Sequence, residues 1–517
     1  MRILSDFGEW IAGSFGRVKL LRSMMAPHWR RVLRALVVSA GFAIYLVAQL
    51  GVGYAVGHDR TAILAIAMFA ISMLVVSAIW PIVGLVALIV VTPLARGFLG
   101  VSGGSLPDIT FDSIMVPALA LVVLFRKLSE SENGAKLNTP ICLLVLYVAY
   151  CAANLWLRGS ASLNNYRGII QYVGFWPMVY FIVVGIIKTD RHVRIILSSL
   201  VVLAFGQGCA LIVEHFTGYA YVSIFYGRAI PLAWLGWADI GEGRAVGLFQ
   251  GPVAPSVFMA ASVLIAMHLS GLTRNRAAKL FCWLTIAIIF LGSFFTYTRN
   301  IYIMLALSVL IMPFMAARNR RTYALIALTA VMLVAVMAPI WMENTEFSNR
   351  LTNVRNIDAR VEMNGTAINL INDNLWFGIG WGNYTAAVVK YFTSAAQLIG
   401  SVSPTTGKMS PLTVHNTYLF VLSEEGVIGA TLYFGSLLGF LAMMWQYRQR
   451  SKPDSGLIGK DLFSIIFIYI GLLFIQFVPY SNYDTQTNLI TWMLLGLGVQ
   501  AFQLQNKTAT AGRVEAA

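Results

Sequence analysis

A histidine and an asparagine, His415 and Asn416, stand directly before a long hydrophobic run of this sequence. An unperturbed histidine titrates near pH 6.5, so at neutral pH it can take a proton from a hydroxyl group. His415 therefore either does chemistry at a membrane surface or marks where a helix leaves the bilayer. Asn416 is expected to position His415 or to cap the helix. Glu424 and Glu425 follow more than two helical turns later, too far to orient His415 directly, and are predicted to pack against or pair with other helices.

Several arginines could bind an anion. Arg299 lies between two apolar runs with almost no loop, a costly place for an arginine that has no partner. Arg244 lies in a glycine-rich stretch just before another run, and glycines allow close approach of the backbone to a ligand. A guanidinium is a planar fork that fits phosphate oxygens with two hydrogen bonds and keeps its charge. Arg360 and Arg167 are further candidates for the same role.

The composition defines the environment in which these residues must work. Of 517 residues, 58% are hydrophobic and 11% charged, whereas soluble domains carry about 25% charged residues. The chain is therefore an integral membrane protein. The net charge of +15 does not indicate nucleic-acid binding, because the positive residues sit mainly between hydrophobic runs. The cysteines show no metal-binding spacing.

The predicted fold is all-α, a polytopic transmembrane helical bundle of about 12–14 spans with one long outer loop. The apolar runs are too long and continuous for the strands of a membrane barrel. The candidate spans are 34–57, 61–79, 81–96, 113–126, 140–157, 168–187, 193–213, 252–271, 279–297, 301–317, 322–340, 415–445, 461–479 and 488–504.

Loop charges orient the bundle. With the N-terminus inside, five successive basic loops fall on the cytoplasmic side, as the positive-inside rule requires. Both termini are then cytoplasmic. The predicted parts are a basic amphipathic N-terminus (1–33), a first transmembrane part with about 11 spans (34–340), an outer loop region (341–414), the C-terminal spans (415–504) and a tail (505–517).

The basic residues left on the outer side need a reason, because the same rule depletes them there. Most are arginines, and some of these are expected to pair with acidic residues or to snorkel to headgroups. They are Arg60, Arg96, Arg158, Arg167, Arg228, Arg244, Arg299, Arg350, Arg355, Arg360, Lys390 and Lys408.

From Arg244 to Gly429 the chain resembles the O-antigen ligase and O-antigen polymerase family of bacterial envelope glycosyltransferases. Asn364 stands where the family often has Trp, and Leu375 where it often has Pro. The segments that carry the resemblance are Arg244-Ala-Val-Gly-Leu-Phe-Gln-Gly-Pro, Thr298-Arg299-Asn300, the stretch from Arg360 to Gly378-Ile-Gly380, and His415-Asn416 followed after nine residues by Gly426-x-x-Gly429.

The resemblance implies a glycan donor on undecaprenyl diphosphate, held at the periplasmic face of the bacterial inner membrane. The glycan passes to an acceptor sugar hydroxyl, with His415 as general base. Arg244, Arg299, Arg360 and Arg167 would hold the diphosphate, with Asn416, Gly378 and Gly380 in support. Neither a cofactor nor a metal is expected. The expected partners are the lipid-linked oligosaccharide, an acceptor glycan that is lipid-linked or part of the lipid A core, membrane lipids and other polysaccharide-export proteins.

Three functions remain open on these residues. A polymerase of O-antigen or exopolysaccharide repeat units joins units that are both lipid-linked, and the long outer loop and the number of spans favour it. An O-antigen ligase passes the chain to lipid A core in lipopolysaccharide synthesis. A flippase of lipid-linked oligosaccharide would place charges near the midplane and show a repeated half, which this sequence does not.

Overall fold

The computed structural model describes residues 72–73, 75–95, 111–130, 138–159, 163–220, 245–249, 255–316, 320–329, 332, 355–392, 414, 416–451, 456–475 and 485–516. The chain divides into two compact units, Met1–Val76 and Ser77–Ala517. Of the first unit, only four residues near its end are described, and they are helical. The predicted span 34–57 and most of 61–79 lie outside the described residues. All elements named below belong to the second unit.

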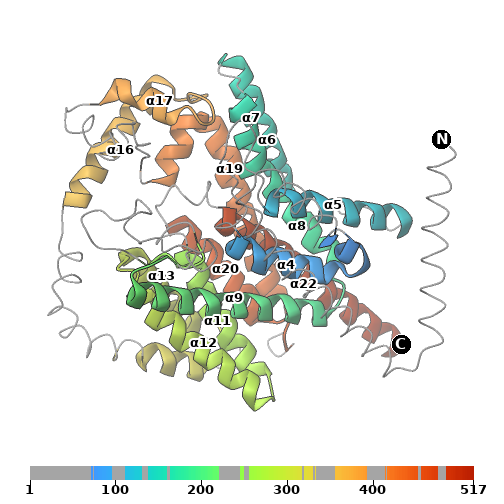
Figure 1. The fold of residues 1–517 in the computed structure, drawn as a ribbon. Helices are drawn as coiled ribbons and strands as arrows, with labels where there is room; N and C mark the ends of the chain where they lie inside the picture. The colour runs from blue at the N-terminus through green and yellow to red at the C-terminus, as the bar shows by residue number, and fades with distance from the viewer. Residues whose placement is uncertain are drawn as a thin grey trace. The chain divides into compact units, whose positions relative to one another are not determined.

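Every element of the described residues is a helix, which confirms the predicted all-α class (Figure 1). Among the described residues, five helices are long and apolar enough to cross a membrane. Each begins and ends within a few residues of a predicted span. They are α6 (Thr139–Leu157), α9 (Asp190–Thr217), α11 (Pro255–Leu272), α12 (Arg276–Phe294) and α19 (Thr417–Arg450).

Other helices complete the bundle. The chain between α6 and α9 forms one interrupted helix, in which a π-helical turn widens the backbone between two α-helical parts. The C-terminal helix continues well past the predicted last span. The bounds are α4 Pro81–Ala95, α5 Phe111–Glu130, α7 Leu163–Ile169, η1 Ile170–Gly174, α8 Phe175–Ile186, α13 Arg299–Met315, α20 Lys460–Ile475 and α22 Thr485–Ala516.

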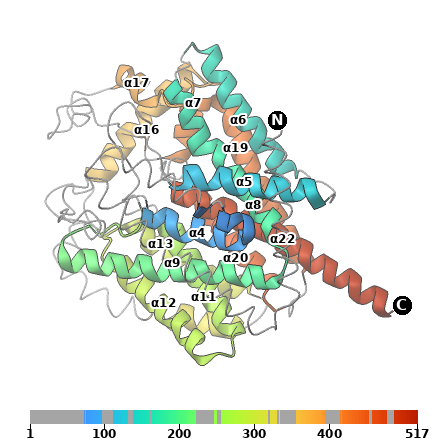
Figure 2. The ribbon, with the colours of Figure 1, turned by 45° about the vertical axis from the view of Figure 1, so that its right-hand side comes forward.

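The predicted outer loop region contains three short or polar helices. They are α16 (Arg355–Asp373), α17 (Tyr384–Val388) and the 3-10 helix η3 (Val389–Tyr391). These helices pack on one another and on α19, beside the beginning of α19 (Figures 1 and 2). The region is therefore a small helical lobe.

Helix α11 forms the centre of one half of the bundle. All of its residues from Pro255 to Ser270 are buried. It packs against α9, α12, α13 and α20 (Figure 2). Its Ala and Ser residues are small, and small side chains let neighbouring helices approach closely in membrane proteins.

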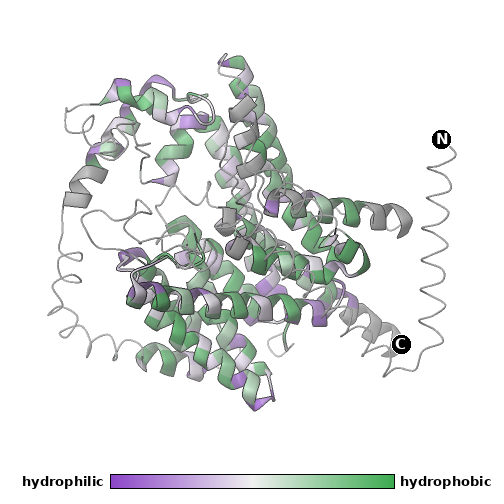
Figure 3. Cartoon of the chain, viewed as in Figure 1, coloured by the Kyte–Doolittle hydropathy of each residue, from purple (hydrophilic) through white to green (hydrophobic). Residues whose placement is uncertain are grey.

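Large apolar side chains cover much of the outer surface. Phe314, Leu280 and Trp156 are 77%, 69% and 71% exposed. Hydrophilic residues gather instead at helix ends, such as the turn between α11 and α12, and on the lobe of α16 and α17 (Figure 3). A surface of this kind is stable only in contact with lipid, so the protein is a multi-pass membrane protein.

Two glycines lie where helices α9 and α12 approach each other closely. Helices α9 and α12 pack along each other, and Gly208 faces Gly292 across them. A Cβ added at Gly208 would lie 2.9 Å from the carbonyl oxygen of Ile288, and one added at Gly292 would lie 2.7 Å from that of Gly208. Glycine at these two positions therefore determines how near the two helices lie.

We expect Gly208→Ala to destabilise the protein by about 1–3 kcal/mol, because backbone atoms cannot move away as a side-chain end can. Thermal unfolding of the purified protein in detergent measures this loss. Gly471→Ala is the matched control, since Gly471 is also helical but has nothing within 4 Å of an added Cβ. That control should be neutral or slightly stabilising. Equal melting temperatures for the two variants would contradict the predicted role of Gly208.

Candidate active site

Helix α19, which follows His415 and Asn416 in the sequence, is broken at Gly426. This residue has φ 64° and ψ −171°, far from helical values, and helical residues flank it on both sides. The part after the break is about 36 Å long at about 1.5 Å per residue. That length alone crosses a hydrocarbon core of about 30 Å. The nine residues from Thr417 to Glu425 therefore form a separate short helix at the end of the span.

The loop after α16 supplies the hydrogen bonds that the broken helix lacks. The amides of Val427 and Ile428 donate to the carbonyls of Leu375 (2.9 Å) and Trp376 (3.3 Å). In return the amides of Ile379 and Gly380 donate to the carbonyls of Ser423 (3.0 Å) and Glu424 (2.7 Å). We call these four bonds the clasp. The clasp joins the two glycine-containing motifs of the sequence, which lie some forty residues apart.

The clasp requires glycine on both sides. Gly378 and Gly426 both have a φ of 64°. A Cβ on Gly426 would lie 2.4 Å from the carbonyl carbon and oxygen of Trp376, and one on Gly378 would lie 2.3 Å from the carbonyl oxygen of Glu424. Gly380 also has a positive φ, of 87°. The predicted supporting residues Gly378 and Gly380 are thus parts of the clasp.

Two polar residues of α6 hold the clasp from the side. Tyr150 donates its hydroxyl to the carbonyl of Glu425 (2.8 Å), and Asn154 donates to the carbonyl of Phe377 (2.7 Å). Asn154 also lies 3.5 Å from a carboxylate oxygen of Glu425. Sequence reasoning missed both α6 residues, although a polar side chain inside an apolar run is a signal of an internal role.

The two glutamates of the motif are buried, each 1% exposed. Glu424 accepts a hydrogen bond from the amide of Tyr384 at the start of α17 (3.2 Å). Glu425 faces Asn154 of α6. Their predicted packing role agrees with these contacts, because one glutamate holds the lobe and the other lies against α6.

The beginning of α19 has a defined cap. Asn416 is its N-cap residue, and its side chain accepts hydrogen bonds from the amides of Tyr418 (3.0 Å) and Leu419 (3.3 Å). This confirms the predicted cap. His415 lies outside the described residues. Its neighbour Val414 is fully buried in the hydrophobic cluster that α16 and α17 form with α19.

The lobe helices carry one of the arginines that the sequence predicts to bind the diphosphate. Arg360 lies in α16, but its side chain is not among those described. The end of the same helix is tied to η3, because Tyr391 donates its hydroxyl to the Asp373 carboxylate (2.8 Å). This bond raises the pKa of Tyr391 above its usual value. Burial and the nearby charge of Glu424 raise the pKa of Tyr384.

Arg167 lies in α7, and again its side chain is not described. Its neighbours in α7 do contact the loop between α16 and α17. Asn165 donates to the side-chain oxygen of Asn383 (3.5 Å), and a Cβ added at Gly168 would lie 3.2 Å from the indole nitrogen of Trp381. The helix that carries Arg167 therefore packs next to the clasp.

Arg299 is the first residue of α13, and it is half-buried. The tight turn before it is held by its own threonines, since Thr298 donates its hydroxyl to the carbonyl of Thr296 (3.0 Å). The side chain of Thr298 therefore does not cap the helix. The side-chain nitrogen of Asn300 is buried and has no hydrogen-bond partner within the described part of the chain.

Arg244 lies outside the described residues, but the turn that follows it, 245–249, is described and buried. Gly247 has φ 66°. The amides of Val246 and Gly247 both donate to one carboxylate oxygen of Glu214, at 2.6 and 2.7 Å. A Cβ on Gly247 would lie 2.6 Å from the Gln207 side chain. The sequence suggested that a ligand approaches the backbone closely at these glycines. At Gly247 the group that approaches is instead the side chain of Gln207.

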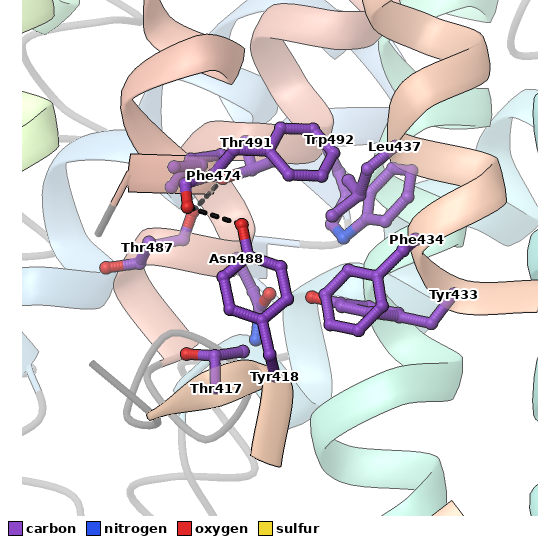
Figure 4. Close-up of a pocket in the computed structure, with 11 residues that line it drawn as sticks. Thr417, Tyr418, Tyr433, Phe434, Leu437, Phe474, Thr487, Asn488, Thr491 and Trp492 are labelled. Carbon is purple, nitrogen blue, oxygen red and sulfur yellow. Dashed lines mark hydrogen bonds between the residues drawn. The ribbon is translucent and has the colours of Figure 1, made fainter. Parts of the chain in front are cut away.

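A pocket opens at the start of α19, between α19, α20 and α22 (Figure 4). Its wall combines aromatic rings with hydroxyl and amide groups, so it can accept a group with both polar and apolar parts. A second, smaller pocket shares Tyr433, Asn488 and Trp492 with it and extends to Tyr147 and Trp381. The residues of the first are Thr417, Tyr418, Tyr433, Phe434, Leu437, Leu473, Phe474, Thr487, Asn488, Thr491 and Trp492.

The described elements next to the predicted residues thus form two clusters on different helices. One joins the clasp, Asn416 and the helices that carry Arg360 and Arg167. The other joins Arg299 and the turn after Arg244 through the end of α9. The described residues contain no group of three His, Cys, Asp or Glu side chains that could hold a metal ion.

The apolar helices, one of them broken at a sequence motif beside a polar lobe, define a multi-pass membrane protein. Residues 284–434, from α12 to the middle of α19, match the family model described as O-antigen ligase. No curated protein matches the chain. This region is thus similar to the O-antigen ligase-like family, as its motifs indicate, and the match supports a membrane glycosyltransferase of the O-antigen ligase or polymerase type.

We expect Gly426→Ala to abolish activity and lower stability. An alanine in the left-handed region costs roughly 1–2 kcal/mol, and its Cβ would also collide with the backbone of Trp376. Proteolysis of the lobe and transferase activity, measured on the same preparation, test this. Gly365→Ala is the control, because Gly365 lies in α16 with open space around it. Full activity of Gly426→Ala would show that the clasp is dispensable.

Proposed function

We propose that this chain transfers a glycan from undecaprenyl diphosphate to an acceptor sugar hydroxyl at the periplasmic face of the inner membrane and so polymerises O-antigen or exopolysaccharide repeat units. The observation that carries the proposal is the start of α19. There the family motif places His415 directly before a cap that Asn416 already provides. Capping is therefore no explanation for His415, and a catalytic role explains it.

In the proposed reaction His415 takes the proton of the acceptor hydroxyl, and the hydroxyl oxygen attacks the anomeric carbon of the donor sugar. The bond from that carbon to the diphosphate oxygen breaks, and undecaprenyl diphosphate leaves with the electron pair. General-base help of this kind is worth roughly 10²–10⁴-fold. The clasp supports this role, because it fixes the short helix that follows His415 against the lobe.

The beginning of α13 supports diphosphate binding. A cation at a helix N-terminus is unfavourable by about 0.3–1 kcal/mol, so Arg299 does not stabilise α13. The side chain of Thr298 does not cap this helix end, and helix N-termini bind phosphate groups. The buried side-chain nitrogen of Asn300 is a further donor at this end. Arg244, Arg360 and Arg167 are proposed to share the diphosphate and to offset charge on the leaving group.

Ligation to lipid A core is the second candidate, because the matching family model is described as O-antigen ligase. Both reactions use the same donor and the same base. They differ in the acceptor alone, so the glycans of a mutant strain distinguish them. A lipid-linked oligosaccharide flippase would have no use for His415.

Replacement of His415 by alanine in the native host should abolish glycan transfer. Surface and lipid-linked glycans, separated on gels, report the outcome. Loss of polymer, with single repeat units still reaching the surface, identifies a polymerase. Loss of all surface-attached glycan, with long chains accumulating on the lipid carrier, identifies a ligase.

His192→Ala is the matched control, because His192 lies at the start of α9 and outside both clusters. The control strain should keep the wild-type glycan pattern. A wild-type pattern in the His415→Ala strain, with the protein present at its normal level, would end the catalytic interpretation of His415.

Activity should fall as the pH drops below about 6.5, since a protonated histidine cannot accept a proton. It should also persist in a chelator, because the arginines take the place of a metal ion at the diphosphate. Initial rates of the purified enzyme over a pH series, with and without EDTA, measure both effects. Loss of activity in EDTA that magnesium restores would contradict the metal-independent mechanism.

A further inference from the structure

The end of α9 contacts both turns next to the arginines of the second cluster. Gln207 and Glu214 lie seven residues apart, two helical turns, and so share one face of α9. That face meets the turn 245–249. His215 follows Glu214 and points about 100° further round the helix. The face of α9 that carries His215 contacts the turn that precedes Arg299.

The first contact is a complete set of hydrogen bonds. Gln207 accepts from the amide of Leu248 (2.6 Å) and donates to the carbonyl of Val246 (3.1 Å). Glu214 accepts from the amides of Val246 and Gly247 through a single oxygen. Gln207 is 0% exposed and Glu214 1% exposed, so these bonds form away from water. Buried groups that lose such partners cost about 1–3 kcal/mol each.

The second contact is a stack of rings. The imidazole of His215 lies parallel to the ring of Phe295, with centroids 4.1 Å apart and an angle of 14° between the planes. The ring of Tyr297 lies edge-on to His215 at 6.0 Å. Tyr297 has φ 48°, a conformation that is costly for a residue other than glycine. A strained turn of this kind persists only when its surroundings hold it.

We propose that Gln207, Glu214 and His215 are positioning residues, which fix the turn after Arg244 and the turn before Arg299 on one rigid helix end. The inference rests on the proposed function, in which these two arginines bind the diphosphate. Two arginines on separate turns can grip one diphosphate only if their spacing is constant. Because both turns are fastened to two successive residues of α9, the spacing of the two turns is set by a helix and not by a loop.

Glu214 does not act on the substrate in this proposal. Successive amides around a glycine with positive φ form a concave site for an anion. Here the carboxylate of Glu214 occupies that site. The side chain of Glu214 already fills this place, so the diphosphate binds beyond this turn.

The test compares Glu214→Gln with Glu214→Leu in the purified full-length enzyme. Glutamine keeps an acceptor oxygen for the two amides, whereas leucine removes it. Misplacement of catalytic groups by about 1 Å can cost about 10²-fold in rate. We therefore expect kcat/KM for the undecaprenyl-diphosphate-linked donor to fall about 10²-fold in Glu214→Leu. Glu214→Gln should stay within a few-fold of the wild type.

His215 provides a second, independent pair. Phenylalanine keeps a flat ring to stack on Phe295, and alanine does not. His215→Phe should therefore retain donor kcat/KM, and His215→Ala should lose it. Gln500→Leu is the matched control for loss of a buried polar side chain, because Gln500 lies in α22 and its side-chain oxygen has no partner among the described residues. Its kinetics should match the wild type.

Arg299→Ala separates the inference from the proposed function on which it rests. If Arg299→Ala loses activity while Glu214→Leu and His215→Ala keep wild-type kinetics, the positioning role is wrong and the proposed function stands. If Arg299→Ala itself keeps full activity, diphosphate binding by Arg299 is wrong and the inference falls with it, whereas His415→Ala tests the transfer reaction separately. If Glu214→Gln is as defective as Glu214→Leu, the charge of Glu214 matters and not its hydrogen bonds, which also overturns the inference.

Discussion

A backbone amide or carbonyl that leaves a helix inside a membrane protein must find a partner there, because hydrocarbon offers none. The break of α19 at Gly426 obeys this constraint, and much of the site follows from it. The amides and carbonyls freed by the break bond to the loop after α16. That loop is therefore held at one place on the bundle, and the lobe helices on either side of it are held with it. The two glycine-containing motifs therefore bind each other through the four hydrogen bonds of the clasp.

The same constraint explains the acidic and amide side chains inside the bundle. Glu214 and Gln207 supply partners to a buried turn, and Asn154 and Tyr150 do so for the clasp. In each case a rigid helix fixes an irregular segment that carries or adjoins a motif residue. The positions of these irregular segments are thus fixed by helices that are long and apolar enough to lie within the membrane.

The apolar runs predicted the helical fold and most positions of the described helices well, because a membrane-spanning helix needs only local apolar sequence. The orientation that the loop charges indicate stays a prediction. The cap at Asn416 was also predictable, since capping depends on neighbouring residues. The roles of Glu214 and Asn154 were not, because their partners lie more than thirty and more than two hundred residues away in the chain. Leu375 replaces a proline of the family pattern without loss, because the clasp uses its carbonyl, which proline also has. The roles of His415 and the arginines remain predictions.

The chain leaves the lobe at Phe392 and returns at Val414, and both residues pack in the same hydrophobic cluster. The ends of segment 393–413 are therefore brought together by contacts that do not involve the segment itself. Lengthening a closed loop is inexpensive, about 0.6 kcal/mol for each doubling of its length. Evolution can accordingly exchange or extend this segment while the clasp and the cap stay in place. The clasp and the cap therefore form a joint whose geometry does not depend on the length of this segment.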